Sequence, residues 1–543
     1  MYSNVPANHV TTEKSSSSSY PQPMNTPKSK SFRRLTKAVV SAGAVSCLLL
    51  SLLSSVTSTD ASAAAVEGQP FTGNASDRPV SAPAVSPVSS NTEQKLHYTA
   101  VEGGYYYTVA LRSDGSVWSW GRNLLGELGI SETIRYRHTF SPVRIPHLSD
   151  VTAISTSGGG YSAAVQADGS VWHWGAGRTP RAVPGITNAA GVTAGSSTSL
   201  VLLRDGTVQS WHNPTDKLPG TSSHEAEREP VLHPIRGLNN VVQTALAGMD
   251  GYALKKDGSV WTWKEADKTN AGPSKPKQIK GLTRISYITD QSGDLLVLDA
   301  KGKVWRVDSK GKRTPYHHEL TVKKMDASSN YVLLVTAKGE VYSYGNTVTG
   351  KQGKIKQLSD ITDVSAGYYH SLARSSNGTV WGWGGDKYQE AGAPATSSGG
   401  MVYTPVQAKL GTDLIVNGKL LPSMYPAVET SAALQLPIKV IATALGAQFQ
   451  VHTTEGQQSH YTLTYNDRII TVRPNEAQYT VSSRNQNKPK EAQVITLSEP
   501  IGNYSGAVTA PYEMFQGLGL NVTWDRSRAA LNMDDTNQAA SAH

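Results

Sequence analysis

Cysteine is almost absent from this chain. Its single cysteine, Cys47, lies in an apolar run, and residues 66–543 contain none. Disulfides are therefore excluded in that region, and its stability must come from burial of apolar side chains. The sequence also contains no Gly-x-Ser-x-Gly elbow, no phosphate-binding loop and no His-Glu-x-x-His motif. Because these enzymatic signatures are missing, we expect no catalytic residue, no cofactor and no metal site.

The excess of positive over negative charge in this chain is also small. The formal net charge is +9, from 51 Lys and Arg against 42 Asp and Glu, and residues 1–65 contribute +4 of it. No dense basic stripe stands out that could follow a phosphate backbone, so we expect no nucleic-acid partner. The segment Lys310–Lys324 is locally basic. A cell-wall polymer of acidic character is the partner that such a segment would suit.

Repetition is what the chain has in abundance. Seven times, a small turn ending in glycine is followed by Val and by aromatic residues at alternate positions. Such alternation predicts a β-hairpin, because successive side chains of a strand point to opposite faces. We expect a tight two-residue turn whose Asp-Gly or Asn-Gly pair supplies the positions with φ > 0. The seven turn glycines are Gly115, Gly169, Gly206, Gly258, Gly302, Gly339 and Gly378.

A second phrase, of the type SPVRIPHLSDV, recurs seven times between and after these hairpins. The turn glycines are 37 to 54 residues apart, enough chain for about four short strands, which is the usual content of one propeller blade. The first hairpin precedes the first copy of the second phrase, and the last copy follows the last hairpin. We therefore expect strands from both ends of the array to complete one shared blade and so remove the free edge.

Two segments carry the repeat in its fullest form. Ala100–Ile130 and Val364–Gly385 share the glycine before the first strand, the Asp-Gly or Asn-Gly turn and the Trp-Gly ending. The first segment also contains the pattern Gly-x-x-x-x-Gly-x-x-Gly at Gly121–Gly129. These segments resemble repeats of the regulator of chromosome condensation family, over about residues 96–411. The resemblance implies a mainly β fold, a seven-bladed β-propeller. Nuclear members act in guanine-nucleotide exchange, and one bacterial relative is a β-lactamase inhibitor.

The first 65 residues are typical of an export signal. A basic segment precedes the apolar run Ala38–Val56, and small residues suited to cleavage follow at Ala61–Ala65; Met24 is an alternative start. A secreted or cell-surface protein is therefore expected, and nucleotide exchange outside the cell is not. The alternative is an uncleaved signal that anchors the chain in a membrane. Residues 66–95 are rich in Ser, Pro and Ala and predict a flexible linker.

A different segment begins near residue 412 and predicts a small α+β domain to residue 534, followed by a tail at 535–543. Leu434–Val451 has a helical period, and His460–Pro474 reads as two strands joined at Asn466-Asp467. The phrases Val416–Lys419, Leu445-Gly446, Leu518-Gly519 and Trp524-Asp525 resemble the N-terminal domain of copper amine oxidases. The chain has no His-x-His pair and no quinone-forming tyrosine phrase, so no oxidase activity is implied.

Candidate binding residues are sought in the loops, since a propeller scaffold is rigid and its loops carry the contacts. Ten of the 11 Trp belong to the hairpin phrase, where packing between blades is favoured over a sugar-binding platform. Adjacent His317 and His318 would point to opposite faces of a strand and suit packing better than a metal. The loop after Trp120 combines arginine with aromatic residues, as interface hot spots do. Its candidate partner-binding residues are Arg135, Tyr136, Arg137 and His138.

The sequence thus favours an exported, non-catalytic scaffold that binds an unidentified protein. Two other functions stay open: a secreted enzyme inhibitor, and an adhesin for wall glycan.

Overall fold

The structure is a computed structural model of the whole chain. It describes residues 95–130, 138–175, 178–213, 229–265, 272–291, 293–347, 349–392, 400–421, 425–453, 458–484, 491–504 and 507–535. The expected export signal, nearly all of the linker and the tail lie outside these ranges. Within them, no helix has the length and apolar character needed to cross a membrane.

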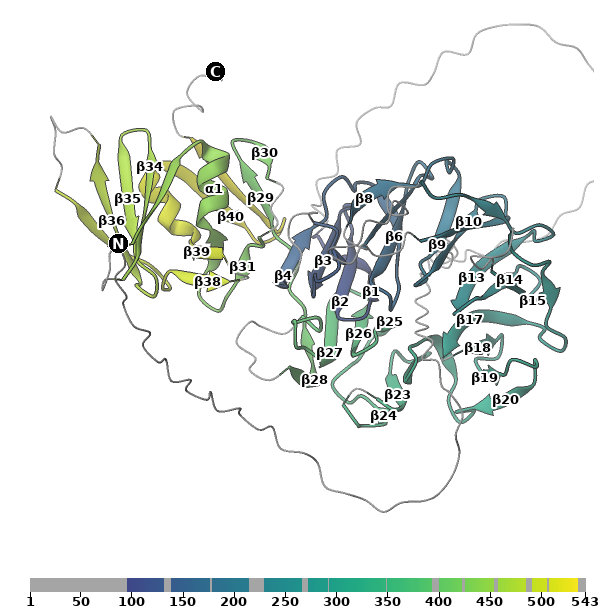
Figure 1. Cartoon of the computed structure of the whole chain (residues 1–543). Helices are drawn as coiled ribbons and strands as arrows, with labels where there is room; N and C mark the ends of the chain where they lie inside the picture. The colour runs from purple at the N-terminus through teal and green to yellow at the C-terminus, as the bar shows by residue number, and fades with distance from the viewer. Residues whose placement is uncertain are drawn as a thin grey trace, which may run out of the picture. The chain divides into compact units, whose positions relative to one another are not determined.

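Strands β1 to β28 form seven successive four-stranded antiparallel sheets, which run from purple to green in Figure 1. Sheet 1 holds β1 (Tyr98–Gly103), β2 (Tyr107–Arg112), β3 (Val117–Gly121) and β4 (Thr139–Arg144). Sheet 2 holds β5 (Val151–Thr156), β6 (Tyr161–Gln166), β7 (Val171–Gly175) and β8 (Arg178–Ala182). Sheet 3 holds β9 (Ala189–Thr193), β10 (Thr198–Leu203), β11 (Val208–His212) and β12 (His233–Pro234). Sheet 4 holds β13 (Val241–Ala247), β14 (Asp250–Lys255), β15 (Val260–Lys264) and β16 (Lys277–Gln278).

The last three sheets repeat the same order. Sheet 5 holds β17 (Ile285–Gln291), β18 (Asp294–Asp299), β19 (Val304–Val307) and β20 (Arg313–Tyr316). Sheet 6 holds β21 (Val322–Ala327), β22 (Tyr331–Thr336), β23 (Val341–Gly345) and β24 (Gly353–Lys354). Sheet 7 holds β25 (Ile361–Ala366), β26 (His370–Ser375), β27 (Val380–Gly385) and β28 (Met401–Gln407). The first strand of each sheet lies against the first strand of the next, and β1 lies against β25, so the sheets form the ring of a β-propeller.

The hairpin turns between the second and third strands differ from the expected two-residue form. In sheet 1 the Arg112 carbonyl accepts from the Gly115 N–H, while the Arg112 N–H donates to the Ser116 carbonyl, which encloses three residues. Only the glycine has positive φ, and across the seven turns that φ lies between 73° and 84°. A type I turn followed by a left-handed glycine explains this geometry. Asp114 contributes differently: its Oδ1 accepts from the Ser116 N–H at 3.1 Å.

The turn glycines also join neighbouring sheets. The Gly115 carbonyl accepts from the N–H of Val151, the first residue of β5, at 3.0 Å, and five further turn glycines bond the following sheet in the same way. At the last turn, a Cβ on Gly378 would lie 2.6 Å from the His97 ring, just before β1. Glycine is therefore needed at these turns both for its left-handed φ and for the close approach of the next sheet.

The prediction that the two ends of the array share one blade is wrong. Sheet 1 is complete from β1 to β4, and sheet 7 is complete from β25 to β28, so no strand of one end of the array completes a sheet of the other. The reason is that Tyr98–Gly103, which precedes the first hairpin, already supplies an inner strand. The final copy of the second phrase supplies most of β28 in sheet 7, and only its end contacts sheet 1. There, the Tyr98 hydroxyl donates to the Lys409 carbonyl at 3.2 Å and accepts from the Gly411 N–H at 3.0 Å.

Side chains bridge the inner edges of adjacent sheets. Ser365 Oγ accepts from the Gly103 N–H at 2.9 Å, which joins sheet 7 to sheet 1, and Ser155 Oγ accepts from the Ala194 N–H at 3.0 Å. These bonds satisfy N–H groups at the edges of the inner strands. Ring closure therefore rests on side-chain bridges and close backbone packing.

Gly103→Ala is expected to weaken ring closure by about 1 to 3 kcal/mol. The added Cβ would lie 2.9 Å from the Cα and N of Gly367, and neither backbone can give way easily. Gly191→Ala is the matched control, since it also lies on an inner strand and its Cβ would have no heavy atom within 4 Å. Urea unfolding followed by tryptophan fluorescence checks this, and an equal loss in both variants would contradict it.

Residues after the propeller form an α+β domain of three sheets. One sheet holds β29 (Asp413–Val416), β30 (Lys419–Leu420), β40 (Leu520–Asp525) and β41 (Ala530–Asp535). A second holds β31 (Val428–Glu429), β32 (Leu434–Pro437), β38 (Gly502–Tyr504) and β39 (Ala507–Pro511). The third holds β33 (Gln448–His452), β34 (His460–Tyr465), β35 (Arg468–Val472), β36 (Gln478–Ser483) and β37 (Gln493–Thr496). The helical elements are α1 (Ile438–Leu445) and the 3₁₀ helix η2 (Tyr512–Leu518).

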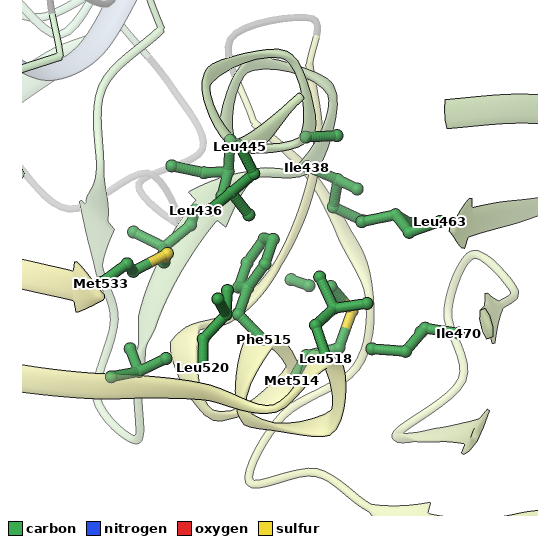
Figure 2. Packing of buried hydrophobic residues seen from close by; sticks show 14 of the residues in the cluster. Leu436, Ile438, Leu445, Leu463, Ile470, Met514, Phe515, Leu518, Leu520 and Met533 are labelled. Carbon is green, nitrogen blue, oxygen red and sulfur yellow. The ribbon is translucent and has the colours of Figure 1, made fainter. Parts of the chain in front are cut away.

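The helical period of Leu434–Val451 located helix α1, although the two ends of that stretch form strands β32 and β33. Helix α1 begins after Pro437 and ends at Gly446, whose φ of 71° caps it, and η2 ends in the same way at Gly519. The Asn466-Asp467 turn lies where expected, between β34 and β35. Figure 2 shows the core: Phe515 and Met514 of η2 pack among side chains of α1 and of the surrounding strands.

Candidate functional site

Two pairs of tyrosines occupy matching turns of the first and last sheets. Tyr105 and Tyr106 join β1 to β2, and Tyr368 and Tyr369 join β25 to β26. The corresponding turns of sheets 2 and 3 hold only glycine and serine, at 158–160 and 196–197. Because sheets 1 and 7 are neighbours in the ring, both pairs meet at one place. All four side chains are partly exposed.

The four rings interlock with a fifth, Tyr388, from the β27–β28 connection. Tyr106 stacks on Tyr369 with centroids 4.4 Å apart, and Tyr105 lies 4.6 Å from Tyr368. Tyr388 meets Tyr106 edge-on at 5.4 Å. These five residues are called the tyrosine patch below. Contacts of this kind between aromatic rings hold each side chain in one orientation.

Glycines allow the two turns to come this close. A Cβ on Gly103 would contact Gly367, and the Tyr368 N–H donates to the Gly104 carbonyl at 3.1 Å. The turns are therefore bonded through their backbones, and the rings that they carry are fixed relative to one another.

A cation borders the patch on sheet 1. The Arg122 guanidinium lies 5.1 Å from the centroid of Tyr105 and 5.0 Å from that of Tyr106. Glu127, which is fully buried, holds this arginine through a bond of 2.7 Å from Nε. Burial raises the pKa of Glu127, and the attraction of Arg122 opposes that rise. The guanidinium is thus fixed over the two rings, as in cation–π contacts.

Sheet 7 repeats this loop without the arginine. Glu390 matches Glu127, but Gly385 stands where sheet 1 has Arg122. Glu390 Oε2 accepts from the Tyr388 N–H at 2.7 Å, whereas Oε1 has no hydrogen-bond partner among the described residues. Burial is the main cause that raises the pKa of Glu390 to about 7. This carboxyl fixes the backbone that carries Tyr388, and Lys387 lies 5.3 Å from the ring of Tyr388.

Of the four candidate residues in the loop after Trp120, one lies within the described ranges. Arg135, Tyr136 and Arg137 lie outside them. His138 lies 5.9 Å from Tyr388 and 4.5 Å from Phe140, at the border of the tyrosine patch. Burial lowers the pKa of His138, so its ring is neutral at physiological pH. The predicted loop and the patch therefore meet at His138.

The patch lies at the end of the sheets opposite the turn glycines. In a four-stranded antiparallel sheet, the first and third connections lie at one end and the second at the other. Tyr105, Tyr368 and Tyr388 belong to first or third connections, whereas the turn glycines belong to second connections. Chemically, the patch offers ring faces, phenol hydroxyls and two cations to a partner. A hydrogen bond with Tyr369, followed by burial, raises the pKa of Tyr105, so its hydroxyl stays protonated.

Sequence reasoning missed the tyrosine patch, although a signal was present. The runs Tyr105–Tyr107 and Tyr368-Tyr369 are visible in the sequence, but the repeat pattern does not show that the turns carrying them lie side by side. Tyr107 does belong to strand β2 and is fully buried. The tryptophans of the repeat were interpreted correctly as packing residues: Trp120 Nε1 donates to the Glu390 carbonyl and Trp174 Nε1 to the Glu127 carbonyl, each across a sheet boundary.

The two adjacent histidines are held by separate contacts. His317 stacks on Tyr344 at 3.5 Å, and His318 Nε2 lies 2.8 Å from the Val304 carbonyl oxygen. Within the described ranges, no three side chains of His, Cys, Asp or Glu gather in a way that would hold a metal ion. In the C-terminal domain, His452 and His460 stack as parallel rings 4.6 Å apart. The described residues therefore do not fit a copper site.

Comparison with known protein families finds a match in the propeller and another in the C-terminal domain. The regulator of chromosome condensation (RCC1) repeat matches residues 98–127, 361–390 and 114–165. The copper amine oxidase N-terminal domain matches residues 415–532. The chain thus combines RCC1 repeats with a domain of the second family. Residues 98–127 and 361–390 contain all five tyrosines of the patch.

Curated relatives align with the propeller. The E3 ubiquitin-protein ligase HERC2 of Homo sapiens is 24% identical over an alignment of 354 positions that covers 54% of this chain and 7% of the ligase. The ultraviolet-B receptor UVR8 of Arabidopsis thaliana is 24% identical over an alignment of 326 positions that covers 54% of this chain and 66% of the receptor. The chain thus spans less than two thirds of the length of either relative. Yeast RCC1 bound to Kap60 has 19% identity and a TM-score of 0.32, over 58% of this chain and 75% of that one.

Proposed function

We propose that this chain is an exported, non-catalytic scaffold whose propeller binds a protein partner through the tyrosine patch. The observation that carries the proposal is the set of five partly exposed tyrosine rings fixed at the junction of sheets 1 and 7. Tyrosine and arginine are the residues enriched at binding hot spots. A ring held in place by its neighbours also loses little conformational freedom when a partner binds.

Export rests on the sequence of the first 65 residues, and it decides where the partner is sought. A propeller with this leader meets proteins of the cell surface or the surrounding medium. The C-terminal domain would position the propeller at the cell envelope. Nucleotide exchange is not proposed, because an exported propeller would not meet a small GTPase.

The double variant Tyr106→Ala/Tyr369→Ala is expected to weaken partner binding about 30-fold or more, since two hot-spot side chains are removed. The partner is first isolated by affinity capture on the purified protein, from culture medium and from intact source cells, and its affinity is then measured by calorimetry. Tyr403→Ala is the matched control, because Tyr403 on β28 is 62% exposed and lies outside the patch.

Three results decide the proposal. A partner lost by the double variant and kept by the control supports it. An unchanged affinity of the double variant, with folding verified by circular dichroism, contradicts it, and so does retention of wall glycan alone. If the captured partner is an enzyme and loses its activity when bound, the scaffold acts as an inhibitor.

A further inference from the structure

The positive charge of the chain is concentrated on one part of the propeller. Residues 275–356 hold 16 Lys and Arg against seven Asp and Glu, a net charge of +9, which equals that of the whole chain. The remaining residues therefore carry equal numbers of cations and acids. This segment contains the outer strand of sheet 4 and nearly all of sheets 5 and 6.

The cations and acids of this segment differ in exposure. Thirteen of the 16 cations are exposed, whereas Glu319 is the one exposed acid among the seven. We call these thirteen residues the basic arc: Lys275, Lys277, Lys280, Arg284, Lys301, Lys310, Lys312, Arg313, Lys323, Lys338, Lys351, Lys354 and Lys356. The solvent-facing charge of the segment is thus more positive than its composition suggests.

Several acids of the segment are engaged with the protein itself. Asp308 Oδ1 accepts the N–H groups of Lys310 and Lys312, each at 2.9 Å, and so closes the turn between β19 and β20. Asp290 and Asp326 are buried. These three carboxylates form no ion pair with a lysine of the basic arc, whereas Glu340 pairs with Lys354 at 2.6 Å.

Contacts between outer strands link the three sheets that carry the arc. Arg313 of β20 donates to the Gly281 carbonyl, beyond β16, at 3.4 Å, which links sheet 5 to sheet 4. Lys275 and Lys277 line a shallow hollow of about 250 Å³ together with Asp308 and Ser309 of sheet 5. The stack of His317 on Tyr344 then links sheet 5 to sheet 6. Strands β20 and β24, labelled in Figure 1, are the outermost strands of these two sheets.

The aromatic rings of this region already have partners. The Arg313 guanidinium lies 4.8 Å from the centroid of Trp305, and that of Arg306 lies 5.1 Å from Tyr316. These contacts hold the guanidiniums in place. They also cover ring faces on which a nucleobase would otherwise stack, and such stacking supports binding to single-stranded nucleic acids.

We propose that the basic arc binds a linear polyanion without bases, whose phosphate or carboxylate groups repeat along the chain. Charges dispersed over three neighbouring sheets suit a chain that follows the outer side of the propeller better than one compact anion. The site is distinct from the tyrosine patch, and the two can be tested separately.

The test measures the affinity of the purified full chain for long-chain polyphosphate and for polyglutamate, at about 0.05 M and about 0.2 M NaCl. The expected result is binding that weakens strongly with salt. One variant replaces four lysines of the arc by glutamine: Lys275, Lys277, Lys310 and Lys312. A matched control makes the same change in charge at four exposed cations elsewhere: Arg236, Lys256, Lys419 and Lys439.

The arc variant is expected to bind polyphosphate at least tenfold more weakly, and the control less than threefold. Tyr106→Ala/Tyr369→Ala is expected to bind it as the original chain does. Tighter binding of polyphosphate than of polyglutamate assigns the phosphate class, and the reverse assigns the carboxylate class. Absence of binding at low salt, equal losses in both four-site variants, or single-stranded DNA bound tenfold more tightly per phosphate would overturn the proposal.

Discussion

Asp290→Asn is expected to stabilise the propeller by about 2 to 5 kcal/mol near pH 8 and to change its stability little near pH 4. Asp290 lies on β17 and is 1% exposed. Burial first, and then the nearby Asp326 and Asp294, raise its pKa to about 8, although the Gly293 N–H opposes this. Its Oδ1 has no hydrogen-bond partner among the described residues.

The sign follows from proton linkage. An unfolded chain loses the Asp290 proton near pH 4, whereas the folded protein keeps it until about pH 8. Unfolding therefore becomes easier as the pH rises between these values, and the loss levels off above pH 8. Asparagine cannot ionise and has nearly the same shape as the protonated acid, so the variant lacks this loss.

Urea unfolding of both proteins across this pH range measures the difference directly. Asp257→Asn serves as a control of opposite sign, because hydrogen bonds from Ser259 lower the pKa of Asp257. That control is expected to lose stability above about pH 4. A difference between Asp290→Asn and the original chain that does not change with pH would contradict the expectation.

Phe515→Ala is expected to cost the C-terminal domain about 3 to 5 kcal/mol. Phe515 is fully buried at the centre of the core in Figure 2, so its removal leaves a cavity that the surrounding strands fill only in part. Hydrogen exchange of amides in α1, β34 and β35 reports the free energy of opening.

Val494→Ala is the control for the same domain, since Val494 on β37 is 63% exposed. It is expected to change the opening free energy by less than about 0.5 kcal/mol. Equal effects of the two substitutions would show that Phe515 is not part of a tightly packed core.

Local sequence signals predicted most of the fold. Each hairpin is encoded by a glycine at a left-handed position and by alternating side chains, and helix α1 by Pro437 and Gly446, all of which act over a few residues. The prediction of the turn type was wrong because an Asp-Gly pair suits both two-residue and three-residue turns. The prediction of a shared blade was wrong because the repeat does not show which segment supplies the first inner strand.

The candidate site depends on contacts that a single sequence does not reveal. Tyr106 and Tyr369 are far apart in the chain, and they stack because sheets 1 and 7 are neighbours in the ring. The same holds for the basic arc, whose cations are divided among three sheets. Asp290 resembles any other acid in the sequence, and only its burial on an inner strand gives it an unusual pKa.

A photo-crosslink from the tyrosine patch tests the central claim most directly. A photoreactive phenylalanine analogue replaces Tyr368 in one protein and Tyr403 in another, and each is irradiated with the captured partner. The account predicts a crosslinked complex from position 368 and none from position 403. Crosslinking from position 403 alone, while the partner remains bound, would contradict the assignment of the tyrosine patch as the binding site.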